Sequence, residues 1–204
     1  MGEVRVERLA AERHADIARV LTDAFLHYPV MRLVSGPEPE AESRIAQFIG
    51  YFVYRRGAQG GPLLGLFVDG ELVGAATMTL PEERAASPSL DAEREAMWTA
   101  IGPGARERYD LYSAVAKTFQ APKPHHHLNM LGIATAYQGR GLARPLLEAT
   151  FDLTRADRSS QGLTLTTELE HNVRLYEYFG FRQTGRARVG DAFDSWGMYL
   201  DTRR

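Results

Sequence analysis

Residues 133–143 read Ile-Ala-Thr-Ala-Tyr-Gln-Gly-Arg-Gly-Leu-Ala, and no other stretch of the chain says as much about the fold. An apolar strand leads into it, and a helix with Leu146 and Phe151 on one face leads out of it. The first N–H groups of a helix have no partner within the helix, and with the helix dipole they attract an anion such as a pyrophosphate. Gly139 and Gly141 allow the backbone to approach the phosphates, because no Cβ stands in the way.

The glycine pattern excludes two common nucleotide-binding motifs. It is not a P-loop, because no Gly-Lys-Ser/Thr follows. It is not a dinucleotide-binding fingerprint either, since the glycine spacing differs and the strand comes late in the chain. Taken alone, the residues leave two interpretations open, a phosphate-binding turn or a plain connection between strand and helix.

Apolar periodicity predicts the elements on either side of this turn. The expected strands are residues 4–9, 63–68, 72–78, 128–134, 163–167, 182–189 and 193–200. The expected helices are residues 17–25, 45–53, two within an insert at about 82–124, 143–151 and 173–179. We expect Pro29 to end the first helix and Asp69-Gly70 to form a type I′ hairpin turn. This order predicts a mixed α/β single domain over residues 1–204.

Composition narrows the function classes. The chain has 204 residues, a net charge of −2 and no cysteine. Disulfides, thiol catalysis and cysteine-ligated metals are therefore excluded, and the charge argues against broad nucleic-acid binding. No apolar run reaches the ~20 residues that a membrane span needs, and residues 1–10 lack the apolar core of a signal peptide. We expect a cytoplasmic protein with no membrane partner.

Residues 138–143 match Gln/Arg-x-x-Gly-x-Gly/Ala, the acetyl-CoA signature of the GNAT superfamily of N-acetyltransferases, which the sequence resembles. Residues 172–181 are similar to the family's Asn-x-x-x-Tyr-x-x-x-Gly-Phe segment, and residues 124–133 look most like the puromycin-type branch. The resemblance implies six or seven mostly antiparallel strands with flanking helices. It also implies that the two strands at 128–134 and 163–167 run parallel and splay apart around acetyl-CoA.

The resemblance also implies the residues that hold acetyl-CoA. These are Leu131, Gly132, Ile133, Gln138, Gly139, Arg140, Gly141, Leu142, Ala143, Arg144, Asn172 and Tyr176. Asn172 has an alternative role as the N-cap of its helix. No metal is expected, because the neighbouring histidines 125–127 point to opposite faces of a strand and lack acidic or cysteine partners at ligand spacing.

Acetyl transfer to an amine needs a proton acceptor, an oxyanion donor and a proton for the departing thiolate, because most amines are protonated near neutral pH. The resemblance assigns these roles to His127, the backbone near Leu131 and Tyr176. His127 and Tyr176 each have an alternative structural role. On a regular strand Asn129 shares a face with His127, although a bulge usually interrupts this strand in the family. Glu168 is a rival base, as is its neighbour at position 170, and we expect both to be solvated charges.

Three functions remain open at this stage. The first is an acetyl-CoA-dependent N-acetyltransferase for a primary amine of a small molecule, by direct attack on the thioester. The second is a protein acetyltransferase acting on lysine or an N-terminus, and the third is a non-catalytic protein that binds CoA or a small molecule. The side chains expected to shape an acceptor pocket, or otherwise to pack in the core, are Phe25, Tyr28, Met31, Trp98, Tyr109 and Tyr112. The insert at 82–124 fits specificity or a dimer contact, so the monomer and the homodimer are both open.

Overall fold

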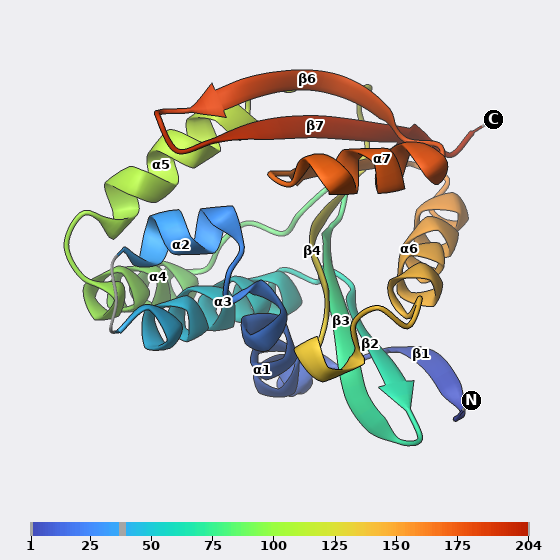
Figure 1. Cartoon of the computed structure of the whole chain (residues 1–204), viewed down its shortest axis with the longest axis horizontal. Coiled ribbons are helices and arrows are strands. Elements are labelled where there is room, and N and C mark those ends of the chain that lie inside the picture. The colour runs from blue at the N-terminus through green and yellow to red at the C-terminus, as the bar shows by residue number, and fades with distance from the viewer. Residues whose placement is uncertain (1, 37–39, 204) are drawn as a thin grey trace.

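The computed structural model describes residues 2–36 and 40–203, and a seven-stranded sheet forms its centre (Figure 1). The strands are β1 Val4–Arg8, β2 Leu63–Val68, β3 Glu71–Thr79, β4 His126–Ile133, β5 Gly162–Thr167, β6 Arg182–Val189 and β7 Phe193–Asp201. Their order across the sheet is β1-β2-β3-β4-β5-β7-β6. Only β4 and β5 pair in parallel, and the other neighbours are antiparallel. The expected mixed sheet is confirmed.

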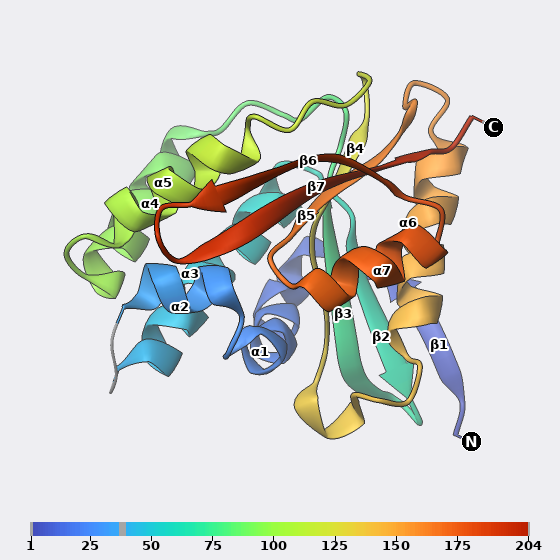
Figure 2. The ribbon, with the colours of Figure 1, turned by 45° about the horizontal axis from the view of Figure 1, so that its top comes forward.

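Helices cover both faces of the sheet (Figure 2). They are α1 His14–Phe25, α2 Pro29–Ser35, α3 Ala41–Ala58, α4 Pro88–Ile101, α5 Ala105–Ala116, α6 Ala143–Ala156 and α7 Glu170–Tyr178, with short 3-10 turns η1 Ala11–Arg13 and η2 Thr135–Tyr137. Helices α1 to α5 bury one apolar cluster, and α6 and α7 bury a second cluster on the opposite side of the sheet. In the part of the chain described, no helix combines the length and apolar character needed to cross a membrane.

The parallel strands β4 and β5 separate soon after they begin. Their pairing ends where Leu128 meets Leu165. Beyond that point residues 130–133 of β4 pair with β3 alone. The edge of β4 that faces β5 is therefore open, as an extended molecule that adds to a sheet edge requires.

A bulge interrupts β4 and changes which way its side chains face. Thr77 pairs with Met130 and the next residue, Met78, pairs with Leu128, so Asn129 is the extra residue. The bulge turns Met130 toward the α1 and α3 side, whereas Leu128 packs on the α6 side. The expectation that Asn129 shares a face with His127 applied to a regular strand, and this bulge, of the kind that usually interrupts the strand in the family, breaks the alternation.

Two helix boundaries also differ from the sequence-based expectation. Pro29 does not merely end a helix, because it occupies the first position of α2, where a missing N–H costs little. Asn172 is not an N-cap, since Leu169 holds that position and Asn172 lies in the first turn of α7. The hairpin turn is as expected, with φ of 49° at Asp69 and 85° at Gly70.

Candidate active site

The glycine turn between β4 and α6 is exposed and shaped for close approach. Gly139 and Gly141 both have φ of +74°, a conformation that favours glycine, and a Cβ at either position would meet nothing within 4 Å. Gln138 closes the turn with a 3.0 Å hydrogen bond from Nε2 to the carbonyl of Ile133. Helix α6 begins at Ala143 without a side-chain cap. Its first backbone N–H groups therefore have no side chain as an acceptor. This cradle fits the pyrophosphate expected from the sequence.

The two arginines of the turn are held by neighbours. Arg140 donates a 2.9 Å hydrogen bond to the carbonyl of Ala136 and lies over the ring of Tyr137. Arg144 forms a 2.8 Å ion pair with Glu148 one turn along α6. Both side chains are at the surface, where they add positive charge around the turn.

A cavity of about 380 Å³ opens where β4 and β5 part. Aromatic and apolar side chains from α1, α2, α3 and α5 and from the connection between α1 and α2 form much of its wall, among them Phe25, Tyr28, Met31, Tyr109 and Tyr112. Trp98 does not line the cavity and instead packs on Phe48 and Tyr109 behind it. The predicted site residues Leu131, Asn172, His127 and Tyr176 do line it, as does Asn129.

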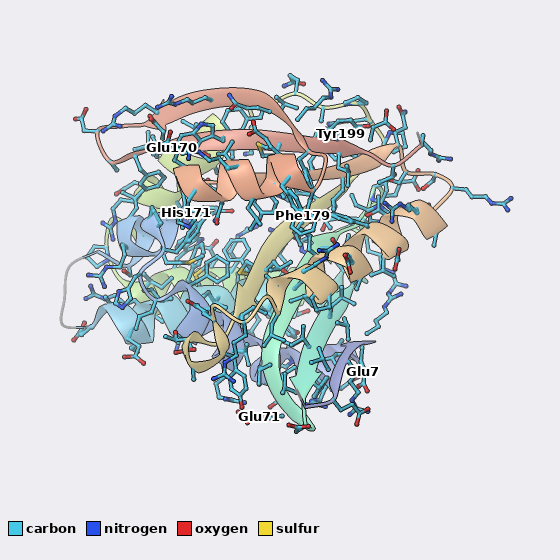
Figure 3. The ribbon with its side chains drawn as sticks, turned by 45° about the vertical axis from the view of Figure 1, so that its right-hand side comes forward. Glu7, Glu71, Glu170, His171, Phe179 and Tyr199 are labelled. Carbon is cyan, nitrogen blue, oxygen red and sulfur yellow. The ribbon has the colours of Figure 1, made fainter. Side chains whose placement is uncertain are left out.

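Glu168 is the residue that the sequence analysis undervalued. It follows β5, lines the cavity and is only 6% exposed, so the expectation of a solvated charge was wrong. Burial raises the pKa of its carboxyl to about 7, against hydrogen bonds from Ser195, Tyr28 and Tyr112 that lower it. Glu170, two residues on, is exposed as expected, and Figure 3 shows it with His171 at the start of α7.

His127 is held as a neutral imidazole in one tautomer. Thr164 Oγ1 donates its hydrogen to the carbonyl of His126, so it accepts from His127 Nδ1 over 2.9 Å. The Nε2 atom then carries the lone pair. Burial, together with the smaller effect of the positive charge of Arg56, lowers the pKa of His127 to about 4. His127 is therefore a weaker proton acceptor than Glu168 near neutral pH.

The neighbouring histidines have other surroundings. His126 is buried on the other face of β4, with Nε2 3.4 Å from Asp157, and His125 contacts the carbonyl of Pro122 over 2.7 Å. Within residues 2–36 and 40–203, no three His, Cys, Asp or Glu side chains cluster in a way that could hold a metal ion.

Tyr176 lines the cavity from the middle of α7, packed edge-on against Phe181 with ring centroids 5.5 Å apart. Burial and the negative charge of Glu168 raise its pKa to about 12, so the phenol keeps its proton at neutral pH. Asn172, one turn earlier, donates a 3.3 Å hydrogen bond from Nδ2 to Thr167 Oγ1. The cavity thus brings a proton donor and a proton acceptor to the opening between β4 and β5.

Comparison with known proteins agrees with this geometry. Residues 108–201 match the family model of the acetyltransferase (GNAT) domain. Over 77 residues the chain is 29% identical to N-alpha-acetyltransferase RimI of Mycobacterium tuberculosis. The aligned region covers 38% of this chain and 48% of that protein. The match thus spans about half the length of this curated relative.

Two solved structures share the fold over nearly the whole chain. A structure from Corynebacterium glutamicum, described as histone acetyltransferase HPA2 and related acetyltransferase, superposes with a TM-score of 0.70 at 20% identity, covering 98% of this chain and 97% of that one. The yncA protein from Salmonella typhimurium, solved with its cofactor acetyl-CoA, has a TM-score of 0.56 at 16% identity, covering 98% and 95%.

The class that the family model defines for residues 108–201 is that of the acetyltransferase (GNAT) domains. The resemblance drawn from residues 138–143 and 172–181 falls within that match, and the fold that it implies is confirmed over nearly the whole chain. The puromycin-type branch stays a prediction.

Proposed function

We propose that this protein transfers an acetyl group from acetyl-CoA to a primary amine of a small molecule. The observation that carries the proposal is the shared cavity of Glu168 and Tyr176, one with a pKa near 7 and the other with a pKa near 12. Direct transfer to an amine needs a base and an acid on either side of the reacting carbonyl. A protein that only stores CoA needs neither group.

Two parts of the chain suit two parts of acetyl-CoA, its pyrophosphate and its extended arm. The turn at 138–143 would hold the pyrophosphate, because its glycines admit close approach and α6 begins with open N–H groups. Main-chain groups of Leu131, Gly132 and Ile133 would hold the extended arm along the open edge of β4. Bound acetyl-CoA supplies an acetyl group activated as a thioester. The N–H near Leu131 is our candidate donor to its carbonyl oxygen.

Glu168 is our candidate for the general base. A carboxylate with a pKa of about 7 is half ionised at neutral pH and accepts a proton from the incoming ammonium more readily than an ordinary glutamate. Its backbone N–H donates a 3.1 Å hydrogen bond to Tyr28 Oη, which fixes the start of the segment after β5. His127, neutral and with Nε2 free to accept, is suited to orienting the amine rather than to holding its proton.

Tyr176 is our candidate for the general acid. Its Oη has no hydrogen-bond partner among the residues that the structure describes, so its proton is available to a group in the cavity. Asn172 lies one turn before it on α7 and is placed to contact the same arm of the cofactor.

The modest volume and aromatic lining of the cavity favour a small acceptor. A chain terminus is the second candidate, because the curated relative is named as an N-alpha-acetyltransferase. A peptide needs a groove open at the surface, whereas α2, α3 and α5 wall this cavity on the side away from the strands.

The experiment is acetyl-CoA-dependent thiol release across a panel of primary amines, peptides with a free N-terminus and peptides with only a lysine amine. Mass spectrometry of the acetylated product identifies the acceptor. Turnover with small amines at a kcat/KM well above that of any peptide supports the proposal. Preference for a free peptide N-terminus would favour the second candidate, and no product from any amine would overturn both.

A further inference from the structure

The acceptor cavity carries opposite charges on different walls. Glu168 is the one carboxylate among its described lining residues, and it lies beside Tyr112 and Tyr28 at the opening between β4 and β5. Arg55 and Arg56, at the end of α3, and Lys117, just after α5, are the described lysine and arginine side chains of the lining. An acceptor amine bound near Glu168 thus shares its cavity with three cations.

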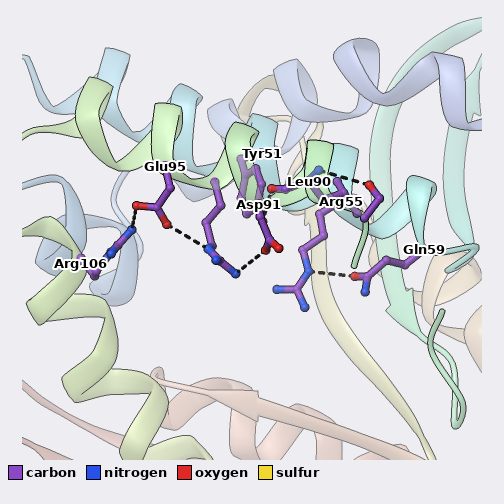
Figure 4. Close-up of polar contacts among 9 residues, drawn as sticks. Tyr51, Arg55, Gln59, Leu90, Asp91, Glu95 and Arg106 are labelled. Carbon is purple, nitrogen blue, oxygen red and sulfur yellow. Dashed lines mark hydrogen bonds and ion pairs between the residues drawn. The ribbon is translucent and has the colours of Figure 1, made fainter. Parts of the chain in front are cut away.

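Arg55 has no acidic partner within the described part of the chain. Its only side-chain hydrogen bond there is a 2.8 Å contact from Nε to Gln59 Oε1 (Figure 4). Two acids of the nearby helix α4 are already occupied, since Asp91 pairs with Arg94 over 3.1 Å and Glu95 pairs with Arg106. The third, Glu93, lines a different pocket. The Nη atoms of Arg55 are therefore available as a fork of donors, the arrangement that suits a carboxylate.

The other two cations differ in their surroundings. Arg56 is only 6% exposed and pairs with Glu83, and its Nε has no hydrogen-bond partner in residues 2–36 and 40–203. Lys117 is exposed at the cavity and forms no ion pair in that same part of the chain. Because Glu83 compensates the charge of Arg56, Arg55 and Lys117 are the cations that leave an excess of positive charge in the wall.

Two tyrosine rings line the cavity together with the opposite charges. Burial raises the pKa of Tyr109, and the charges of Arg55 and Arg56, which line the same cavity, oppose that rise. Burial and the charge of Glu168 raise the pKa of Tyr112. The centroids of Tyr109 and Tyr112 are 6.2 Å apart. A ligand that reaches both charged walls therefore lies along aromatic surface, which suits an apolar or aromatic spacer.

We infer that the acceptor is a primary amine that also carries an anionic group, a carboxylate by the geometry of Arg55, beyond an apolar or aromatic spacer. This inference rests on the proposed function and names its substrate class. The amine lies toward Glu168 and the anion lies toward Arg55, Arg56 and Lys117. The same charges disfavour a polyamine, because its second ammonium would face Arg55 and Lys117, which have no acidic partner in the described residues.

Three probes that share one benzylamine group test this class. They are 4-(aminomethyl)benzoate, the neutral analogue benzylamine and the diamine 1,4-bis(aminomethyl)benzene. Binding of each to the protein with saturating CoA is measured by calorimetry, and acetylation is measured by thiol release. We expect the carboxylate probe to bind at least tenfold more tightly than benzylamine, and the diamine to bind more weakly than either.

Substitutions at Arg55 assign the effect to this wall. Arg55→Gln should reduce the preference for the carboxylate probe over benzylamine about tenfold, expressed as the ratio of the two dissociation constants, and Arg55→Lys should restore part of it. Arg94→Gln is the matched control, because Arg94 is an exposed arginine of α4 outside the cavity lining. It should leave the ratio unchanged. A CoA-induced rise in Tm shows that each variant is folded.

The outcomes separate this inference from the proposed function. Equal binding of the three probes, or an Arg55→Gln variant with the wild-type ratio, would overturn the inference even if amines are acetylated. A preference for the carboxylate probe that depends on Arg55 supports the inference. If that preference occurs without any acetylated product, the anion-binding wall stands and the proposed acetyl transfer fails.

Discussion

Ser195 Oγ donates a 2.7 Å hydrogen bond to Glu168 Oε1, which joins the middle of β7 to the residue that follows β5. Both side chains are buried, with exposures of 0% and 6%. The bond favours the ionised carboxylate, so it lowers the pKa of Glu168 while burial raises it. Ser195 therefore helps to set the pH at which the proposed base becomes active.

The pH dependence of Ser195→Ala tests this relationship. The base must be deprotonated, so kcat/KM of the wild type should rise with pH through a midpoint near the pKa of about 7 for Glu168. Removing the hydroxyl removes a bond that lowers this pKa, so the rising limb of the variant should move to higher pH. The plateaus well above the midpoint should be similar. A variant whose rising limb coincides with that of the wild type would show that Ser195 does not tune the base.

Glu168→Gln and His127→Gln distinguish the two candidate bases. Glu168→Gln should lower kcat/KM at pH 8 by about 10²–10⁴-fold, the usual contribution of a general base. His127→Gln should cost much less, because a histidine with a pKa of about 4 is too weak a base to keep a proton taken from an ammonium. Glu170→Gln is the control for charge, since Glu170 is exposed on α7. If the His127 variant proves to be the slower one, the roles proposed here are reversed.

Tyr176→Phe tests the proposed acid. Its kcat should fall about tenfold to a hundredfold, because the leaving thiolate loses its proton donor. The Tm should change little, since Tyr176 Oη has no hydrogen-bond partner in the described residues and the ring contact with Phe181 remains. Steady-state kinetics and a thermal melt measure both effects. A large loss of Tm with normal kcat would mean that the tyrosine is structural.

Helix α1 packs closely against β4 at Gly132. A Cβ at this position would lie 2.7 Å from Ala24 Cβ and 3.0 Å from Phe25 Cε2. Gly132→Ala should therefore lower the free energy of unfolding by about 1–3 kcal/mol through overpacking. Gly50→Ala is the matched control, because a Cβ there meets nothing within 4 Å and α3 should gain about 0.5–1 kcal/mol. Urea denaturation measures both, and equal effects would contradict this packing.

The fold was largely predictable because its signals are local. Alternating apolar residues mark the strands, Asp69-Gly70 has the conformation that its hairpin needs, and the glycines at 139 and 141 adopt the positive φ that only glycine takes freely. The role of Pro29 at the start of α2 was missed, because proline is equally at home after one helix and at the first position of the next.

The site was harder to predict, because its properties arise from contacts between distant segments. Glu168 is buried by Tyr28, Tyr112 and Ser195, which come from three other parts of the chain, and nothing next to it in the sequence signals this. The acidic side chain directly after an apolar strand was the one available hint. The bulge at Asn129 depends in the same way on the register with β3.

Acetyl-CoA binding is the measurement that tests the account most directly, because every proposed role depends on that cofactor. Gly141→Asp places a carboxylate in the open turn, and Gly141→Asn is the matched neutral variant, since both residues tolerate a positive φ. Acetyl-CoA at a hundred times its Kd should stabilise the wild type by about 2.7 kcal/mol, seen as a rise in Tm. We predict that this rise persists in Gly141→Asn and is lost in Gly141→Asp. No rise in the wild type at millimolar acetyl-CoA would contradict the account.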